Sequence, residues 1–167
     1  MRNTLDLFLP LIVISILMSC ESLKGEDPSV SHLGKWELEE SLNSWFPDTT
    51  PVSELGYSET YDFRSNGTFT KTNSKFDRLL TGTYEITPAE KEFEASFQSS
   101  LTLTYNASDL EGLPTNESGN VYWNDDPFFW IIYGTKDSEV VFLHKDGTLT
   151  NAGYGWADGP VYVYNKK

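Results

Sequence analysis

The chain has 167 residues, a formal net charge of −13 at pH 7 and an aromatic content of 14%. A surface this acidic repels polyanions, so the composition argues against nucleic acid and anionic lipid as partners. The length suits one domain with its own core, and the aromatic content favours strands over helices.

The amino-terminal segment has the features of a cleavable leader. Arg2 precedes an apolar run over residues 7–18. A helix that crosses a bilayer needs about 20 apolar residues, so this shorter run is typical of a signal peptide. It ends in Leu17-Met18-Ser19-Cys20, which resembles the lipobox of bacterial lipoproteins and contains the only cysteine. The resemblance implies cleavage before Cys20 and lipidation of its thiol. The alternatives are an ordinary secretory leader with a chance cysteine, or an uncleaved short anchor.

The residues around Cys20 also predict a tether and a location. Lipoproteins carry three acyl chains on this cysteine, and each buried methylene contributes about 0.8 kcal/mol to membrane attachment. In that family an aspartate directly after the cysteine favours inner-membrane retention. Here Glu21 and Ser22 follow, so we expect an outer-membrane location, with periplasmic and surface orientations both open. We expect a signal peptide over 1–19, a lipidated cysteine and flexible tether over 20–30, and one folded domain over 31–167.

From Leu33 onward the sequence alternates between apolar and polar residues with a period of two. This pattern predicts antiparallel strands that have one buried face and one exposed face. A meander of about eight or nine such strands removes its edges by closing into a barrel. The expected strands include residues 36–39, 60–64, 68–70, 83–87, 101–105, 128–133, 139–144, 148–152 and 161–165.

Two turns between these strands have sharp signals. They are Ser65-Asn66-Gly67-Thr68 and Lys145-Asp146-Gly147-Thr148. Asn-Gly and Asp-Gly tolerate the positive φ angles of a type I′ turn, so both segments predict tight hairpins.

Three ordered motifs resemble the lipocalin-like domains of small bacterial envelope lipoproteins. They are Gly34-Lys35-Trp36, Asn66-Gly67-Thr68-Phe69 and Gly82-Thr83-Tyr84-Glu85-Ile86. The resemblance covers about residues 31–167 and implies an all-β, antiparallel, up-and-down eight-stranded barrel. It also implies that Trp36 closes one end. No arginine lies near the carboxyl end to stack on this indole, and Lys166 or Lys167 could take its place as a cation over the ring.

The sequence has no strong catalytic or metal-binding motif. The only histidines, His32 and His144, lie far apart, and Cys20 is expected to be acylated. The Gly-x-Ser-x-Gly elbow of serine hydrolases and the glycine loops that hold phosphates are missing. We therefore expect no enzyme activity, no metal and no cofactor. A pair of carboxylates would suffice for glycoside hydrolysis, which an acidic chain leaves open.

Several aromatic residues are candidates for ligand contact. Trp45 and Phe46 lie in the long connection after the first strand, where they could form a lid or pack back onto the barrel. The inward residues could line a cavity or fill it, because an eight-stranded barrel is just wide enough for either. These inward candidates are Trp36, Tyr61, Phe63, Phe69, Tyr84 and Tyr105.

A second candidate surface is the segment 127–133, in which strict alternation fails. One face would fill the barrel. The other would be covered by the chain, or would expose Phe128, Phe129 and Trp130 as a patch for a partner.

Together these observations predict a lipid-anchored, outer-membrane, lipocalin-like protein that binds a small apolar or amphipathic ligand. The alternative is a surface module with a solid barrel core that contacts an envelope protein or a glycan.

Overall fold

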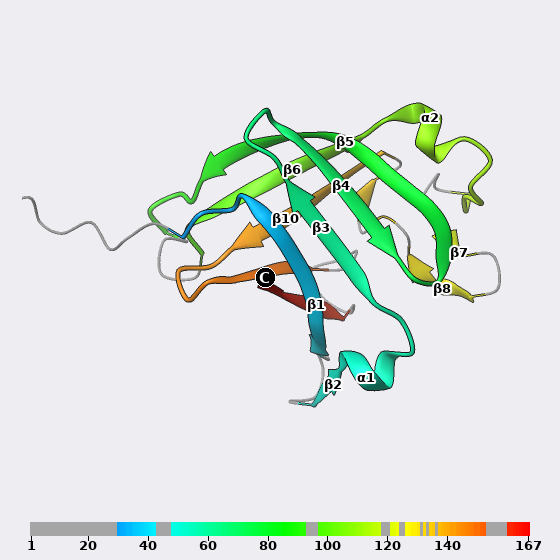
Figure 1. The fold of residues 1–167 in the computed structure, drawn as a ribbon, viewed down its shortest axis with the longest axis horizontal. Coiled ribbons are helices and arrows are strands. Elements are labelled where there is room, and N and C mark those ends of the chain that lie inside the picture. The colour runs from blue at the N-terminus through cyan, green and yellow to red at the C-terminus, as the bar shows by residue number, and fades with distance from the viewer. Residues whose placement is uncertain are drawn as a thin grey trace, which may run out of the picture.

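A computed structural model describes residues 30–42, 48–92, 97–117, 121–123, 126–130, 132, 134–135, 137–152 and 160–167. Its main feature is a closed antiparallel barrel of eight strands that follow one another in chain order (Figure 1). The strands are β1 (Gly34–Leu42), β3 (Glu59–Phe63), β4 (Thr68–Asn73), β5 (Phe76–Pro88), β6 (Ser99–Tyr105), β10 (Ser138–Leu143), β11 (Thr148–Ala152) and β12 (Val161–Lys166). β12 pairs with both β11 and β1, which closes the ring. The predicted fold class, an up-and-down eight-stranded β-barrel, is confirmed.

The other elements lie in two connections. β2 (Thr49–Pro51) and α1 (Val52–Leu55) lie between β1 and β3. The connection between β6 and β10 carries α2 (Ala107–Leu110), β7 (Tyr122–Trp123), β8 (Asp126–Trp130) and β9 (Gly134–Thr135). β8 pairs with β7 in a separate two-stranded sheet. The expectation that residues 128–133 form a barrel strand is therefore wrong for residues 128–130, since their near-continuous apolar sequence does not specify which sheet they join.

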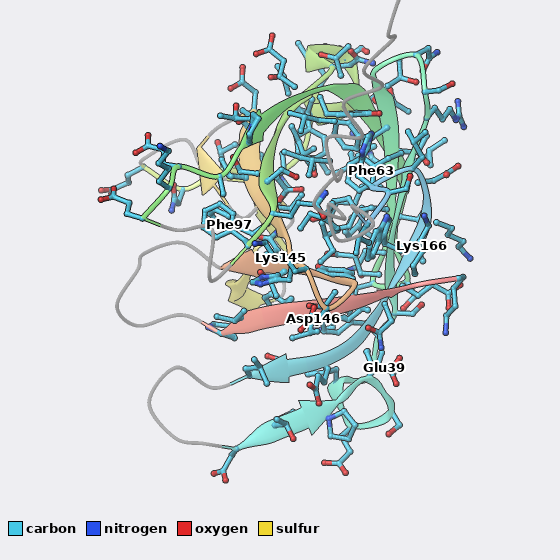
Figure 2. All side chains as sticks on the ribbon, turned by 90° about the vertical axis from the view of Figure 1, so that its left-hand side faces the viewer. Glu39, Phe63, Phe97, Lys145, Asp146 and Lys166 are labelled. Carbon is cyan, nitrogen blue, oxygen red and sulfur yellow. The ribbon has the colours of Figure 1, made fainter. Side chains whose placement is uncertain are left out.

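The barrel has two different ends. We call one the Trp36 end: β1 begins there, β12 finishes there, and the turns 64–67 and 144–147 are short. We call the other the Glu59 end: β3 begins there, β4 turns into β5, and both long connections join their strands. In Figure 1 α2, β7 and β8 gather at the right, on the Glu59 end. Figure 2 looks onto the Trp36 end, with Phe63 among the strands and Lys145 and Asp146 on their turn.

The two short hairpins use a different turn from the expected type I′. Among the described residues only glycines have positive φ, with Gly67 at 78° and Gly147 at 91°. Gly67 N donates to Arg64 O at 3.1 Å, and Arg64 N donates to Thr68 O at 2.9 Å. This is a three-residue loop, which requires positive φ at one position only. The Asn66 Oδ1 atom accepts from Thr68 N and Thr68 Oγ1, and these bonds hold Asn66 in its ordinary region.

Alternation along the strands builds one continuous core inside the barrel. In β3 and β6 every second residue is buried, which is the pattern of side chains that point to one face. Among the described residues, no helix is long and apolar enough to cross a membrane.

Candidate functional site

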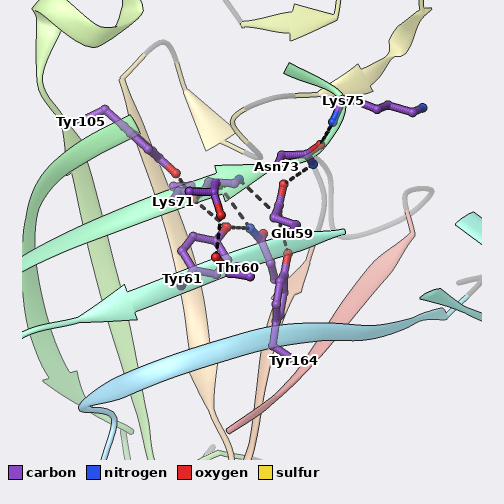
Figure 3. A network of polar contacts seen from close by, with 11 residues as sticks. Glu59, Thr60, Tyr61, Lys71, Asn73, Lys75, Tyr105 and Tyr164 are labelled. Carbon is purple, nitrogen blue, oxygen red and sulfur yellow. Dashed lines mark hydrogen bonds and ion pairs between the residues drawn. The ribbon is translucent and has the colours of Figure 1, made fainter. Parts of the chain in front are cut away.

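The Glu59 half of the barrel interior is polar and charged. Alternation places Glu59 on the inward face of β3, Lys71 and Asn73 on that of β4, and Glu139 and Asn151 on those of β10 and β11. All five are at most 4% exposed. Together with three tyrosines they form one hydrogen-bonded group, part of which is shown in Figure 3. We call it the core network: Glu59, Tyr61, Lys71, Asn73, Tyr105, Glu139, Asn151 and Tyr164.

Lys71 lies between the two buried carboxylates. Its Nζ is 3.4 Å from Glu59 Oε1 and 3.5 Å from each carboxylate oxygen of Glu139. Hydrogen bonds between an ammonium and a carboxylate are normally about 2.7–2.9 Å long. The Lys71 ammonium is thus shared between two carboxylates. Its distance to each of them is longer than in an ordinary pair of one ammonium and one carboxylate. The same Nζ lies 5.0 Å from the centre of the Tyr61 ring.

Each carboxylate has further donors. The Glu139 Oε1 atom accepts from Tyr61 OH at 2.8 Å and from Tyr105 OH, and Glu139 Oε2 accepts from Asn151 Nδ2 at 3.3 Å. Burial raises the pKa of the Tyr61 and Tyr105 phenols well above 10.0. Both phenols therefore remain protonated and can donate at physiological pH.

The second carboxylate, Glu59, is held from two sides. Tyr164 OH donates to Oε1 at 2.6 Å and Asn73 Nδ2 donates to Oε2 at 2.8 Å (Figure 3). Burial nevertheless raises the pKa of the Glu59 carboxyl above its ordinary value of 4.5, against the opposing effect of Lys71. Loss of solvation is the largest cause, because it penalises the charged form.

The raised pKa of Glu59 predicts a specific pH dependence of stability. The folded protein holds this proton to a higher pH than the unfolded chain does, so the folded state binds more protons from pH 4.5 upward. The free energy of unfolding of the wild type, minus that of Glu59→Gln, should therefore fall as pH rises through this window. Urea unfolding of both proteins from pH 4 to pH 8 measures this difference.

Glu85→Gln is the matched control for that series, because Glu85 is exposed on β5. The free energy of unfolding of the wild type, minus that of Glu85→Gln, should not show the fall with pH that is expected for Glu59→Gln. A wild-type minus Glu59→Gln difference that grows with pH would show that Glu59 is stabilised as a carboxylate.

One buried acceptor of the core network has no hydrogen-bond donor among the described residues. Asn151 is fully buried and its Nδ2 donates to Glu139, yet its Oδ1 receives no hydrogen bond from the residues that the structure describes. A buried acceptor without a donor costs about 1–3 kcal/mol. This cost reduces the net contribution of the core network to stability.

The core network reaches the surface at Asn73. This residue also lines a surface pocket of about 570 Å³ formed by the β4–β5 hairpin, which we call the hairpin pocket. Lys75, two residues further along the chain, donates from its backbone N to Asn73 Oδ1 at 2.9 Å. The Asn73 amide is thus fixed between Glu59 inside the barrel and the hairpin outside it.

The inward aromatic residues divide between the two halves of the barrel. Tyr61 and Tyr105 belong to the core network, whereas the others gather at the Trp36 end. There Phe63 lies 6.2 Å from Phe69 and 5.3 Å from Tyr84, measured between ring centres. These rings contact one another and are mostly buried, so they fill this part of the barrel.

Trp36 closes this end as the resemblance implied. It is fully buried, and its Nε1 donates to His32 O at 2.7 Å. Lys166 Nζ lies 5.9 Å from the centre of the indole ring, which confirms that a lysine covers it.

The remaining candidates fall outside the described parts of the structure. Cys20, Trp45 and Phe46 lie outside the described residues. Phe128, Phe129 and Trp130 lie in β8, for which the structure describes the backbone but not the side chains. Their proposed roles therefore stay predictions. Among the described residues, no three His, Cys, Asp or Glu side chains gather as metal ligands.

Sequence reasoning identified Tyr61 and Tyr105 but missed the charged members of the core network. The sequence feature that could have identified them is their spacing from apolar residues that face inward. Glu59 lies two residues before Tyr61, and Lys71 lies two residues after Phe69, so each shares a strand face with a buried aromatic residue. No sequence pattern indicated the hairpin pocket, because most of its lining residues are polar and lie close to a turn. Comparison of the chain with protein-family models, curated proteins and solved structures finds no match.

Proposed function

We propose that this protein is a lipid-anchored binding protein of the outer membrane, with a lipocalin-like barrel and no enzyme activity. It binds a small amphipathic ligand at the Glu59 end. The observation that carries the proposal is the hairpin pocket, which lies beside an exposed apolar side chain and contacts the core network through Asn73.

The size and lining of the hairpin pocket suit such a ligand. Pockets for small molecules are typically about 300–1,000 Å³, and this one is about 570 Å³. Leu79 lines it and is 55% exposed, which is the largest exposure of any large apolar side chain among the described residues. The apolar part of a ligand would cover Leu79, while its polar part meets the hydrogen-bonding groups of the hairpin.

The core network supports a role beyond stability. Apolar side chains of similar volume are often as stabilising as a buried ion pair, or more so. Here the barrel instead retains Glu59, Lys71 and Glu139, and no residue that the structure describes donates to Asn151 Oδ1. The network fixes Asn73 at the base of the hairpin pocket, so it holds the pocket ready for a ligand.

The same geometry argues for binding rather than hydrolysis. A glycosidase needs a sugar or a water between its two carboxylates. In the core network that place is taken by the Lys71 ammonium, which contacts both Glu59 and Glu139.

The binding proposal predicts uptake of an apolar dye. Residues 21–167, which contain every contact described above, should bind N-phenyl-1-naphthylamine with a rise in dye fluorescence. Leu79→Ser should weaken this binding about tenfold, because burying a leucine side chain contributes about 1.5–3 kcal/mol. A fluorescence titration of both proteins measures the dissociation constants.

Ile86→Ser is the matched control, since Ile86 is an exposed apolar residue of the same strand, 43% exposed, toward the Trp36 end. It should bind the dye as the wild type does. Equal weakening by both substitutions would mean that the dye coats the barrel surface without a site.

A solid-core interaction module is the second candidate. The packed rings at the Trp36 end favour it, because they leave that half of the barrel filled with side chains. A complete lack of dye binding by the folded wild type would support this alternative over the ligand-binding one.

A further inference from the structure

The hairpin pocket collects positive charge on a strongly acidic protein. The whole chain has 25 acidic and 12 basic residues. Two of the basic ones, Lys75 and Arg78, line this one pocket, and Asp77, whose side chain lies outside the described part of the structure, comes between them in the sequence. Two cationic side chains thus lie together on a protein whose overall charge repels anions.

The Arg78 side chain is positioned by neutral groups. Its Nη1 donates to Glu111 O at 2.6 Å and to Asp109 O at 3.4 Å, both at the end of α2. These carbonyls orient the guanidinium but do not neutralise its charge. The described ion pairs do not include Arg78. The guanidinium has five N–H donors in a fork that matches an oxyanion, and its hydrogen bonds to the described residues use Nη1.

The rim of the pocket supplies further groups of the same kind. Lys75 Nζ lies 5.0 Å from the centre of the Tyr57 ring, which holds the ammonium at the pocket. Ser74 Oγ accepts a hydrogen bond from Ser58 N at 2.9 Å, so its own O–H can donate. A hydroxyl and two cations on one small hairpin are the donors that bind phosphate or carboxylate groups.

Asn73 lies between the hairpin pocket and the charged groups of the core network. Two carboxylates and one ammonium would leave it with one excess negative charge. Burial raises the pKa of the Glu59 carboxyl, which works against that excess negative charge. The Asn73 amide also separates Glu59 from the pocket.

The geometry points to an oxyanion site: the hairpin pocket binds the phosphate or carboxylate group of a small molecule through Arg78 and Lys75, with its apolar part on Leu79. This inference rests on the proposed ligand-binding function and names the charge of the ligand. Arg78 supplies the fork, Lys75 a second charge, and Leu79 the apolar contact. Anionic membranes are disfavoured as the source of the oxyanion, because the net charge of −13 repels them.

Four ligands that share an eight-carbon chain test the inference: octyl phosphate, octanoate, octanol and octylamine. Each competes with N-phenyl-1-naphthylamine for residues 21–167. Octyl phosphate and octanoate should compete at least about tenfold better than octanol and octylamine, as loss of charge-assisted hydrogen bonds predicts. Inorganic phosphate is added as a fifth competitor. Inhibition by inorganic phosphate as well as by the two octyl anions assigns the site to free oxyanions too. Inhibition by the two octyl anions but not by inorganic phosphate assigns it to amphipathic oxyanions, and both outcomes support an oxyanion site.

Arg78→Gln should abolish the preference for the two anions and leave octanol competition unchanged. Lys145→Gln removes one positive charge at the opposite end of the barrel and should leave the preference intact. Lys75→Gln provides the same test if Arg78→Gln does not fold, as judged by thermal unfolding. Equal competition by octanol and octyl phosphate, or a preference that survives both pocket substitutions, would overturn the oxyanion site while the proposed function stands. A folded wild type that binds no dye would instead remove the proposed function.

Discussion

Replacing Lys71 with methionine should lower the free energy of unfolding by about 3–5 kcal/mol, the cost of breaking a buried ion pair on one side only. The substitution leaves Glu59 and Glu139 in the barrel interior without their shared ammonium, and both are about 1% exposed. Methionine keeps most of the side-chain length, so little of the loss comes from a cavity. Urea unfolding at pH 7 measures the change.

Two further proteins separate charge from packing in this experiment. Lys35→Met removes an exposed lysine that pairs with Glu37, and it should cost less than about 1 kcal/mol. Adding Glu59→Gln and Glu139→Gln to Lys71→Met should recover much of the lost stability, because the uncompensated charges are then gone. A loss below 1 kcal/mol for Lys71→Met alone would mean that the core network tolerates two unpaired carboxylates, which contradicts the proposed role of Lys71.

Replacing Cys20 with alanine should release the protein from the membrane almost completely. A single acyl chain binds a membrane only reversibly, with an association constant of about 10⁴ M⁻¹, whereas several chains hold it effectively permanently. The variant should lose both incorporation of labelled palmitate and co-sedimentation with the outer membrane. Metabolic labelling and membrane fractionation of the expressing bacteria measure the two effects.

Ser19→Ala is the control for this substitution, because it keeps a small residue before the cysteine. It should be labelled and should sediment as the wild type does. A Cys20→Ala protein that remains in the membrane fraction would show that the apolar run over 7–18 acts as an uncleaved anchor, one of the alternatives to a lipobox.

The barrel could be predicted from the sequence because strand alternation is a local signal. Residues such as Tyr61 and Phe63, or Leu101 and Leu103, mark the inward face by their spacing alone. The type of turn could not be predicted from the sequence, because Asn66-Gly67 fits both a two-residue and a three-residue loop. The choice depends on hydrogen bonds across the hairpin, such as Arg64 N to Thr68 O.

The sequence indicated the tyrosines of the core network but not its charged members. A glutamate or lysine in phase with apolar residues usually marks the end of a strand, because charged side chains are rarely buried. Glu59 and Lys71 are buried because β3, β4 and β10 bring opposite charges together from segments far apart in sequence. That pairing depends on the closed ring of strands.

The position of Arg78 also depends on segments far apart in sequence, because its partners Asp109 O and Glu111 O lie on the connection after β6.

The most direct test of the ligand site is an NMR titration of residues 21–167 with N-phenyl-1-naphthylamine, followed through backbone amide shifts. The proposal predicts that the largest shifts cluster at Asn73, Lys75 and Leu79 of the β4–β5 hairpin and that Trp36 and Ile86 remain unchanged. Shifts centred on the Trp36 end, or no shifts at a dye concentration that saturates fluorescence, would contradict it.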